Sequence, residues 1–454
     1  MNPLLVPLAH GIVGREDLPI EPWVFGWAAA SVLVISFVAL AIVWPSPRLE
    51  HTTGWRVLGV PRIVEVLCGL IGIALFGVVV WAGLAGAQSQ TANLAPTFIF
   101  VLFWVGIPVF SAFFGDVFRA FNPWRALGRG AGWIAKRVAP GSLPEALPYP
   151  ERLGRWPAVL GLFGFVWLEL AYATPQDPST LAVLALVYAA IQLVGMSLYG
   201  VDAWERDGDG FGVYFRLVGG ISPLRWHDRQ LFVRPPLSAL TELRRVPGTV
   251  ALLAVIIGST SFDGMRENQW WTDLALDIQG VAEDAGLSAT TGLEVAYTLG
   301  LIGVICIAAL LFWFGVQGMR TVDDTYPARD LARRFAHTLV PIAFAYVLAH
   351  YFSFLAYQGQ AAAFLASDPL GRGWDVFGTT DNTIDYTVVS ANGIWYVQVG
   401  ALVVGHVAGL VMAHDRALAV FEDPKRATRS QYWMLATMVA FTSLGLWLLS
   451  SLSR

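Results

Sequence analysis

Charged side chains are scarce in this chain of 454 residues. Asp, Glu, Lys and Arg together make up 14% of it, and apolar residues make up 56%. Soluble proteins carry roughly 25% charged residues, and the mean hydropathy of +0.58 likewise indicates an apolar chain. This composition excludes an ordinary soluble fold as the first interpretation and favours a protein embedded in a bilayer.

An excess of positive charge, clustered cysteines and nucleotide-binding motifs are also lacking. The net charge of -4 provides no basic field for nucleic acid. The two cysteines, Cys68 and Cys306, lie in separate apolar runs, which excludes a disulfide framework and a thiolate metal site. The sequence has no Gly-x-x-x-x-Gly-Lys-Ser/Thr loop and no histidine pair at the spacing of a zinc hydrolase helix, so it does not indicate ATP-driven transport or soluble-type metallohydrolysis.

Long apolar runs, in contrast, are abundant. A membrane-spanning helix needs about 20 mostly apolar residues, because every backbone polar group in hydrocarbon must be satisfied internally. We therefore predict an all-α, polytopic transmembrane helix bundle. Its ten spans are expected at 23–44, 63–86, 95–115, 157–174, 180–200, 247–262, 294–316, 336–357, 394–413 and 431–451.

The basic residues fall almost entirely on one face of this threading. Of the 29 Lys and Arg, 25 lie in or beside alternate connections, which the positive-inside rule places in the cytoplasm. The prediction is therefore a protein of the cytoplasmic (plasma) membrane with both termini outside. It has an outer tail over 1–22, a single membrane domain over 23–454 and longer outer loops at 263–293 and 358–393. The predicted cytoplasmic loops are 45–62, 116–156, 201–246, 317–335 and 414–430.

Two connections carry amphipathic patterns. Between Gly115 and Gly130, aromatic residues alternate with arginines, and Arg119, Trp124 and Arg125 typify the pattern. It predicts an interfacial segment with its apolar side among the lipid headgroups and its cations toward anionic lipid. In the first long outer loop, apolar residues from Trp270 onward recur at helical spacing and predict a short surface helix.

Four predicted spans contain ionisable candidates, whose cost in hydrocarbon marks a functional or a paired structural position. Glu65 lies just inside the second span, and Glu169, His350 and His406 lie deeper in theirs. Glu169 and His350 each lie about 20 Å along their spans from the cytoplasmic side, and His406 lies nearer the midplane. If they converge, they can bind a polar solute, pass protons or hold a divalent metal ion through His350, His406 and Glu169. The structural alternative is a buried histidine hydrogen-bonded to a neighbour, and Tyr346, one turn before His350, is the obvious partner.

Haem ligation is not favoured by the spacing of the histidines. Two stacked haems would need His337 and His350 on one helix to face His406 and His414 on another. The separations of 13 and 8 residues correspond to rises of about 20 Å and about 12 Å, which do not match. The identity of any cofactor therefore stays open, with a divalent metal as the candidate.

Five short segments carry a resemblance: Leu8–Gly11, Asp17–Pro19, Ala336–Pro341, Gly405–Gly409 and Ala413–Arg416. Through them, the chain resembles a family of bacterial polytopic membrane proteins labelled fenitrothion hydrolase. The resemblance implies an organophosphate triester hydrolase of a bacterial cytoplasmic membrane, in which a metal-bound or base-activated water attacks phosphorus. It would assign that chemistry to the two intramembrane histidines and the glutamate.

Two function classes and a third alternative follow from the sequence. The first is an integral membrane protein that binds or translocates a small polar solute or ion at an intramembrane His/Glu site. The second is a membrane-embedded hydrolase of the type that the resemblance implies, and the third is a non-catalytic subunit of a membrane complex. The predicted partners are the lipid bilayer and a small solute or ion, and homo-oligomerisation stays open.

Overall fold

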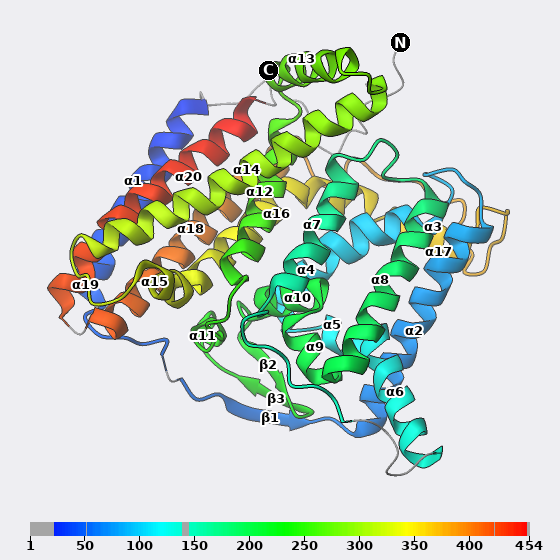
Figure 1. Ribbon diagram of the computed structural model, residues 1–454, viewed down its shortest axis with the longest axis horizontal. Helices are drawn as coiled ribbons and strands as arrows, with labels where there is room; N and C mark the ends of the chain where they lie inside the picture. The colour runs from blue at the N-terminus through cyan, green and yellow to red at the C-terminus, as the bar shows by residue number, and fades with distance from the viewer. Residues whose placement is uncertain (1–21, 51, 139–144, 422, 452–454) are drawn as a thin grey trace.

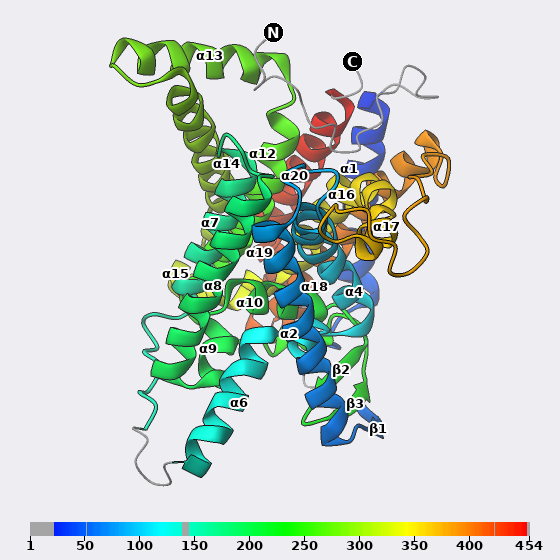
Figure 2. The same cartoon turned by 90° about the vertical axis from the view of Figure 1, so that its right-hand side faces the viewer.

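The computed structural model describes residues 22–50, 52–138, 145–421 and 423–451, and these are mostly helical (Figures 1 and 2). Within these ranges, seven helical stretches are long and apolar enough to cross a membrane. They contain α1 (Pro22–Val43), α2 (Arg62–Ala85), α3 (Leu94–Pro96) with η2 (Thr97–Gly106) and α4 (Ile107–Phe114), α8 (Pro178–Tyr199), α14 (Ala289–Arg320), α15 (Ala328–Phe335) with η3 (Ala336–Thr338) and α16 (Leu339–Gln358), and α18 (Ala391–Phe421).

Three further apolar helices lie where the sequence predicts spans: α7 (Trp156–Leu170), α12 (Thr249–Met265) and α20 (Tyr432–Ser451). With 15 and 17 residues, α7 and α12 are about 23 Å and about 26 Å long. A hydrocarbon core of about 30 Å is thicker than either helix. Neither helix alone is therefore long enough to cross the hydrocarbon core, and other parts of the protein would have to complete the crossing.

The long helices surround a buried centre (Figure 1). Helices α1, α14, α18 and α20 lie on one side of the molecule, α2 and α8 lie on the other, and α7, α12 and α16 lie between them. Most of α12 is buried, from Leu252 through Thr260 and again at Phe262. A helix that is apolar all round belongs in such a position.

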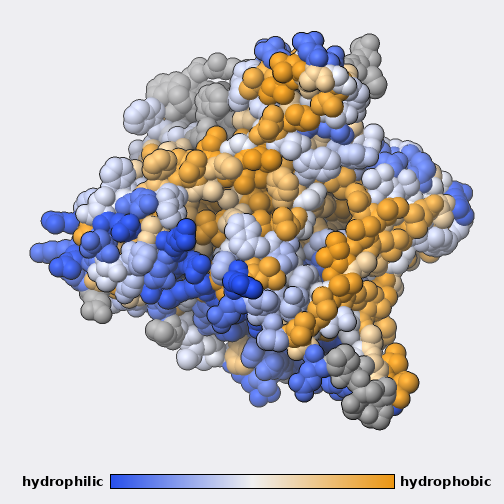
Figure 3. All heavy atoms as spheres, viewed as in Figure 1, coloured by the Kyte–Doolittle hydropathy of each residue, from blue (hydrophilic) through white to orange (hydrophobic). Residues whose placement is uncertain are grey.

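The surface between the two ends of the molecule is apolar (Figure 3). Large side chains such as Ile71 on α2, Ile191 on α8 and Leu310 on α14 are exposed there. Exposed apolar surface on this scale is characteristic of helices that face lipid.

One end carries a small sheet in the regions that the sequence analysis assigns to loops 45–62 and 201–246. Strands β1 (Trp55–Gly59), β2 (Leu224–His227) and β3 (Gln230–Val233) form an antiparallel sheet in the order β1-β3-β2. Asp228 and Arg229 form the β2–β3 turn with positive φ, as a tight hairpin requires. The helical class is right, but the purely helical description omitted this sheet.

The remaining elements are short. The end with the sheet also carries α6 (Pro123–Val138), α9 (Val201–Asp207) and α11 (Ser238–Thr241), and the opposite end carries α13 (Gln269–Asp284), which is the predicted outer surface helix (Figures 1 and 2). The others are α5 (Phe118–Phe121), α10 (Gly210–Gly219), α17 (Ala361–Ser367) and α19 (Pro424–Ser430). The predicted tail over 1–22 lies outside the described residues except for Pro22.

Candidate functional site

A buried carboxylate, Asp263, joins three other side chains at the end of the central helix α12. Its Oδ2 accepts a hydrogen bond from the Tyr351 hydroxyl at 2.8 Å and lies 2.8 Å from His350 Nε2. Its Oδ1 lies 2.8 Å from Arg266 Nε. Asp263 is 1% exposed, so this group of charges is shielded from solvent.

The local sequence explains why these groups meet. Asp263 is in the last turn of α12, where the helix dipole disfavours a negative charge. Arg266, three residues later at the C-cap, supplies the compensating cation. Gly264 packs beside the imidazole of His350, which would be in ordinary van der Waals contact, at 3.8 Å, with a Cβ at that position. His350 and Tyr351 are neighbours on α16, and both reach Asp263.

Glu169 approaches the same cluster from α7. It is 7% exposed, and its Oε2 has no hydrogen-bond partner among the described residues. The charges of Asp263 and Arg266 act on it directly, and Arg266 also donates a hydrogen bond from Nη1 to the Leu170 carbonyl at 3.4 Å. Through Asp263, the site therefore combines two residues that the sequence singled out, Glu169 and His350.

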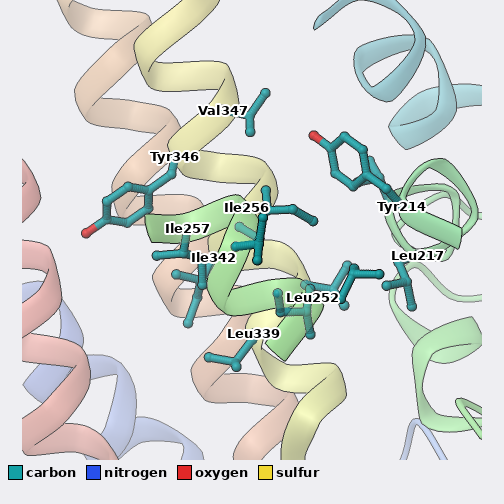
Figure 4. Close-up of a cluster of buried hydrophobic side chains, with 14 of the residues drawn as sticks. Tyr214, Leu217, Leu252, Ile256, Ile257, Leu339, Ile342, Tyr346 and Val347 are labelled. Carbon is teal, nitrogen blue, oxygen red and sulfur yellow. The ribbon is translucent and has the colours of Figure 1, made fainter. Parts of the chain in front are cut away.

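His406 and Tyr346 lie in a separate contact. His406 Nδ1 is 2.7 Å from the Leu402 carbonyl in its own helix, and the ring centres of His406 and Tyr346 are 5.9 Å apart. The Tyr346 hydroxyl donates to the Phe441 carbonyl at 2.8 Å, and Figure 4 shows it pointing away from the side on which Tyr214 lies. His406 is thus a buried histidine hydrogen-bonded to a neighbour, as the structural alternative describes. Tyr346, the partner expected for His350, bonds to Phe441 instead, and His350 pairs with Asp263.

The three-residue metal site considered from the sequence is not assembled. Across the described ranges, no three side chains of His, Cys, Asp or Glu are placed to bind one metal ion. His350 contacts Asp263 and Glu169 lies within electrostatic reach of it, whereas His406 turns toward its own helix backbone. The described residues therefore do not bring His350, His406 and Glu169 together as ligands of one ion.

Asp263, Arg266 and Tyr351 are the site residues that the sequence analysis missed. Asp263 lies one residue beyond the predicted end of its span at 262, so it was counted with the outer loop. A usable signal was present, since Arg266 is one of four basic residues on the predicted outer face. An isolated arginine so close to an apolar helix indicates a buried acidic partner.

The three residues that typify the predicted interfacial segment make contacts within the protein. Trp124 and Arg125 are 5% and 7% exposed, so neither reaches a headgroup region. Trp124 Nε1 donates to Asp209 at 2.8 Å. Arg125 lies 3.0 Å from Glu205 and 3.1 Å from Glu65. Arg119, with a side chain 40% exposed, lies 3.2 Å from Glu205. The arginines serve an ionic network with acidic residues of α2 and α9, and within it the Arg125–Glu205 pair is buried.

The arrangement at Asp263 is suited to binding and exchanging protons. The His350–Asp263 pair places an imidazole, which can hold a proton on either ring nitrogen, at hydrogen-bond distance from a carboxylate. Arg266 neutralises one negative charge, while Glu169 supplies a second acid. Glu267 follows Arg266 in the chain. Burial raises the pKa of its carboxyl group, and the charge of Arg266 opposes that effect.

No family model matches the chain, and no curated protein or solved structure is similar to it. The resemblance to proteins labelled fenitrothion hydrolase therefore stays a prediction.

Proposed function

We propose that the chain is an integral membrane protein that binds or translocates a small polar solute or ion at the cluster of Glu169, Asp263, Arg266 and His350. The observation that carries this proposal is the buried His350–Asp263 pair, with Glu169 and Arg266 within electrostatic reach. Ionisable groups inside an apolar bundle are costly and by default mark a pathway or a binding site.

The proposal includes ten crossings of the cytoplasmic membrane, with both termini outside. The start of α1 and the end of α20 lie at the same end of the molecule as α13, and the sheet lies at the other end (Figures 1 and 2). This placement supports an even number of crossings. The Lys and Arg bias then assigns the end with the sheet to the cytoplasm.

In the proposed topology, the site lies toward the outer side of the bundle. If α7 and α12 begin at the inner edge of the hydrocarbon core, their last turns, which carry Glu169 and Asp263, end within its thickness of about 30 Å. Irregular backbone at such a depth is tolerated where it lines a polar cavity or is covered by protein. A solute or ion arriving from outside would therefore meet Arg266 and Glu267 first and Glu169 next.

Electrical recording on proteoliposomes tests the proposal. Purified protein would be reconstituted, adsorbed to a solid-supported membrane and exposed to pulses of protons, sodium ions and small polar solutes. We expect a transient current with at least one of them. His350→Gln and Asp263→Asn should abolish it, because each removes one half of the acid–base pair.

His406→Gln is the matched control, since it replaces a buried histidine outside the cluster. It should leave the current unchanged. Currents of equal size in all the variants would remove this site from the function.

A hydrolase is the second candidate, and one observation favours it. His350 is held by a carboxylate in the manner of a general base, which could activate a water molecule for attack on a phosphotriester. Detergent-purified protein would be assayed with a chromogenic phosphotriester, and His350→Gln should abolish the release of the chromophore. Hydrolysis without any current would favour this candidate. The absence of both hydrolysis and current would favour a non-catalytic subunit.

A further inference from the structure

The negative ends of two helices converge on Glu169. It is the second-last residue of α7, and its neighbour Asp263 is in the last turn of α12. The C-terminal end of a helix carries a partial negative charge and favours cations. In membrane transporters, such ends commonly stabilise the coupling cation.

The charged groups around Glu169 nearly cancel one another when Glu169 itself is protonated. Asp263 and Arg266 lie 2.8 Å apart and offset each other, while Tyr351 from α16 and Tyr214 from α10 are neutral hydroxyls. Glu267 is 34% exposed at the rim, so water screens its charge. An ionised Glu169 beside a neutral His350 would leave an uncompensated negative charge in a buried place, which is strongly unfavourable. The net charge of the site is therefore close to zero when one proton lies on either Glu169 or His350.

A second set of polar atoms lies beside Glu169 without partners in the described structure. Tyr214 is fully buried, its hydroxyl has no hydrogen bond, and it is within electrostatic reach of Glu169. Figure 4 shows that hydroxyl directed away from α10. Trp104 in η2 packs on Tyr214 and on Phe165, one turn before Glu169, with ring centres at 5.3 Å and 4.8 Å. Its indole N–H is also buried without a partner.

The chemistry of these atoms favours a proton over a metal cation as the bound ion. An indole N–H is only a donor and cannot ligate a metal cation. Three buried polar atoms lack partners in the described structure, and the contacts of the Trp104 ring with Tyr214 and Phe165 place their side chains in one region. Buried polar groups of this kind are suited to hold a water molecule. A π-helix such as η2 is rare and is frequently found at functional sites.

We propose that Glu169 and Tyr214, flanked by Trp104, form a proton-binding subsite in which a water molecule joins the glutamic acid to the tyrosine hydroxyl. This inference rests on the proposed function and names its ion. The transported species at the cluster is the proton, which moves between Glu169 and the His350–Asp263 pair. No bond other than O–H and N–H bonds is made or broken in this transfer.

Infrared difference spectroscopy on the purified full-length protein tests the subsite directly. A pH step would be applied to the protein in lipid while the C=O stretch of protonated carboxyl groups is recorded. We expect a band that titrates and that Glu169→Gln removes. Tyr214→Phe should shift this band without removing it, because one hydrogen bond through the water is lost.

Glu294→Gln is the matched control, since Glu294 accepts a hydrogen bond from the Ala173 backbone N–H at 3.0 Å near the same end of α7. It should leave the band unchanged. A band that survives Glu169→Gln, or one unaffected by Tyr214→Phe, would overturn the inference. A band that behaves as expected in a protein that produces no current with any pulsed ion or solute would support the subsite and overturn only the transport function.

Discussion

Removing the carboxylate of Asp263 should destabilise the protein more than removing the hydroxyl of its partner Tyr351. It faces His350, Tyr351 and Arg266 at 2.8 Å each. Asp263→Ala would leave Arg266 without its closest compensating charge, and breaking a buried pair in this way costs about 3–5 kcal/mol. Tyr351→Phe removes one hydrogen bond to a charged group and should cost about 1.5–3 kcal/mol.

Thermal unfolding of both variants in the same detergent would measure this difference. The expected order is wild type, then Tyr351→Phe, then Asp263→Ala as the least stable. Equal unfolding temperatures for Asp263→Ala and the wild type would mean that the cluster contributes nothing to stability.

Asp116 makes stability depend on pH at the opposite end of the molecule. It follows α4, and its Oδ1 accepts a hydrogen bond from the Arg119 backbone N–H at 3.3 Å. Burial raises the pKa of this carboxyl group from 3.8 to about 6, with Arg216 opposing the shift and Glu205 adding to it. Because the folded state holds the proton more tightly than the unfolded state, this contribution is complete below about pH 4 and is lost as the pH rises through about 6.

Asp116→Asn should therefore flatten the fall in unfolding temperature between pH 4 and pH 7. At pH 7, the variant should be more stable than the wild type by about 1–2 kcal/mol after screening. Melting curves across this pH range would show the difference. A parallel pH profile in the two proteins would contradict the assignment.

At the residue scale, the sequence predicted which buried polar residues matter better than it predicted their partners. Glu169 and His350 stand out because a charge inside an apolar run is rare. Their common neighbour Asp263 does not stand out, since the position of a helix end decides whether it counts as loop or membrane. His406 has the same sequence signal as His350 but turns to the Leu402 carbonyl. Depth along a helix follows from sequence, whereas the direction of a side chain depends on which helices are neighbours.

At the element scale, the pair α16 and α18 depends on close backbone approach. A Cβ at Gly405 would lie 2.2 Å from the Cβ of Ala345 and 2.9 Å from the Pro341 carbonyl oxygen. Small residues permit such contacts between membrane helices. Gly405→Ala should force the helices apart and destabilise the protein by about 1–3 kcal/mol.

Gly400→Ala in the same helix is the control, because a Cβ there meets nothing within 4 Å. It should be neutral or stabilising by up to about 1 kcal/mol through the better helix propensity of alanine. Unfolding temperatures in detergent would separate the two variants. An equal effect of both substitutions would show that the two helices do not approach this closely at Gly405.

Elements were predictable where a long apolar run determines them. Each of the ten predicted spans falls on a helix, but α7 ends at Leu170 and not at the predicted 174. The buried helix α10 was missed, since ten residues rich in glycine and aromatics resemble an interfacial loop. The strands were missed because β1 pairs with β3 far along the sequence, and such a pairing has no local signal.

At the scale of the whole molecule, the two ends differ in charge, and this difference predicts their sides of the membrane. Asp277 on α13 and His227 on β2 are exposed at opposite ends of the molecule (Figure 1). If the positive-inside rule holds, α13 faces outward and the sheet faces the cytoplasm. The two native cysteines would first be replaced by serine, which leaves a background without thiols.

Asp277→Cys and His227→Cys would then be introduced separately and treated with a membrane-impermeant maleimide on intact cells. We expect labelling of Asp277→Cys on intact cells, and labelling of His227→Cys only after permeabilisation. The opposite pattern would invert the molecule and place the cluster at Asp263 nearer the cytoplasm, so that its proton would enter from inside. Labelling of both positions on intact cells would mean that the two ends of the molecule lie on the same side of the membrane. That result would contradict the proposed topology of ten crossings.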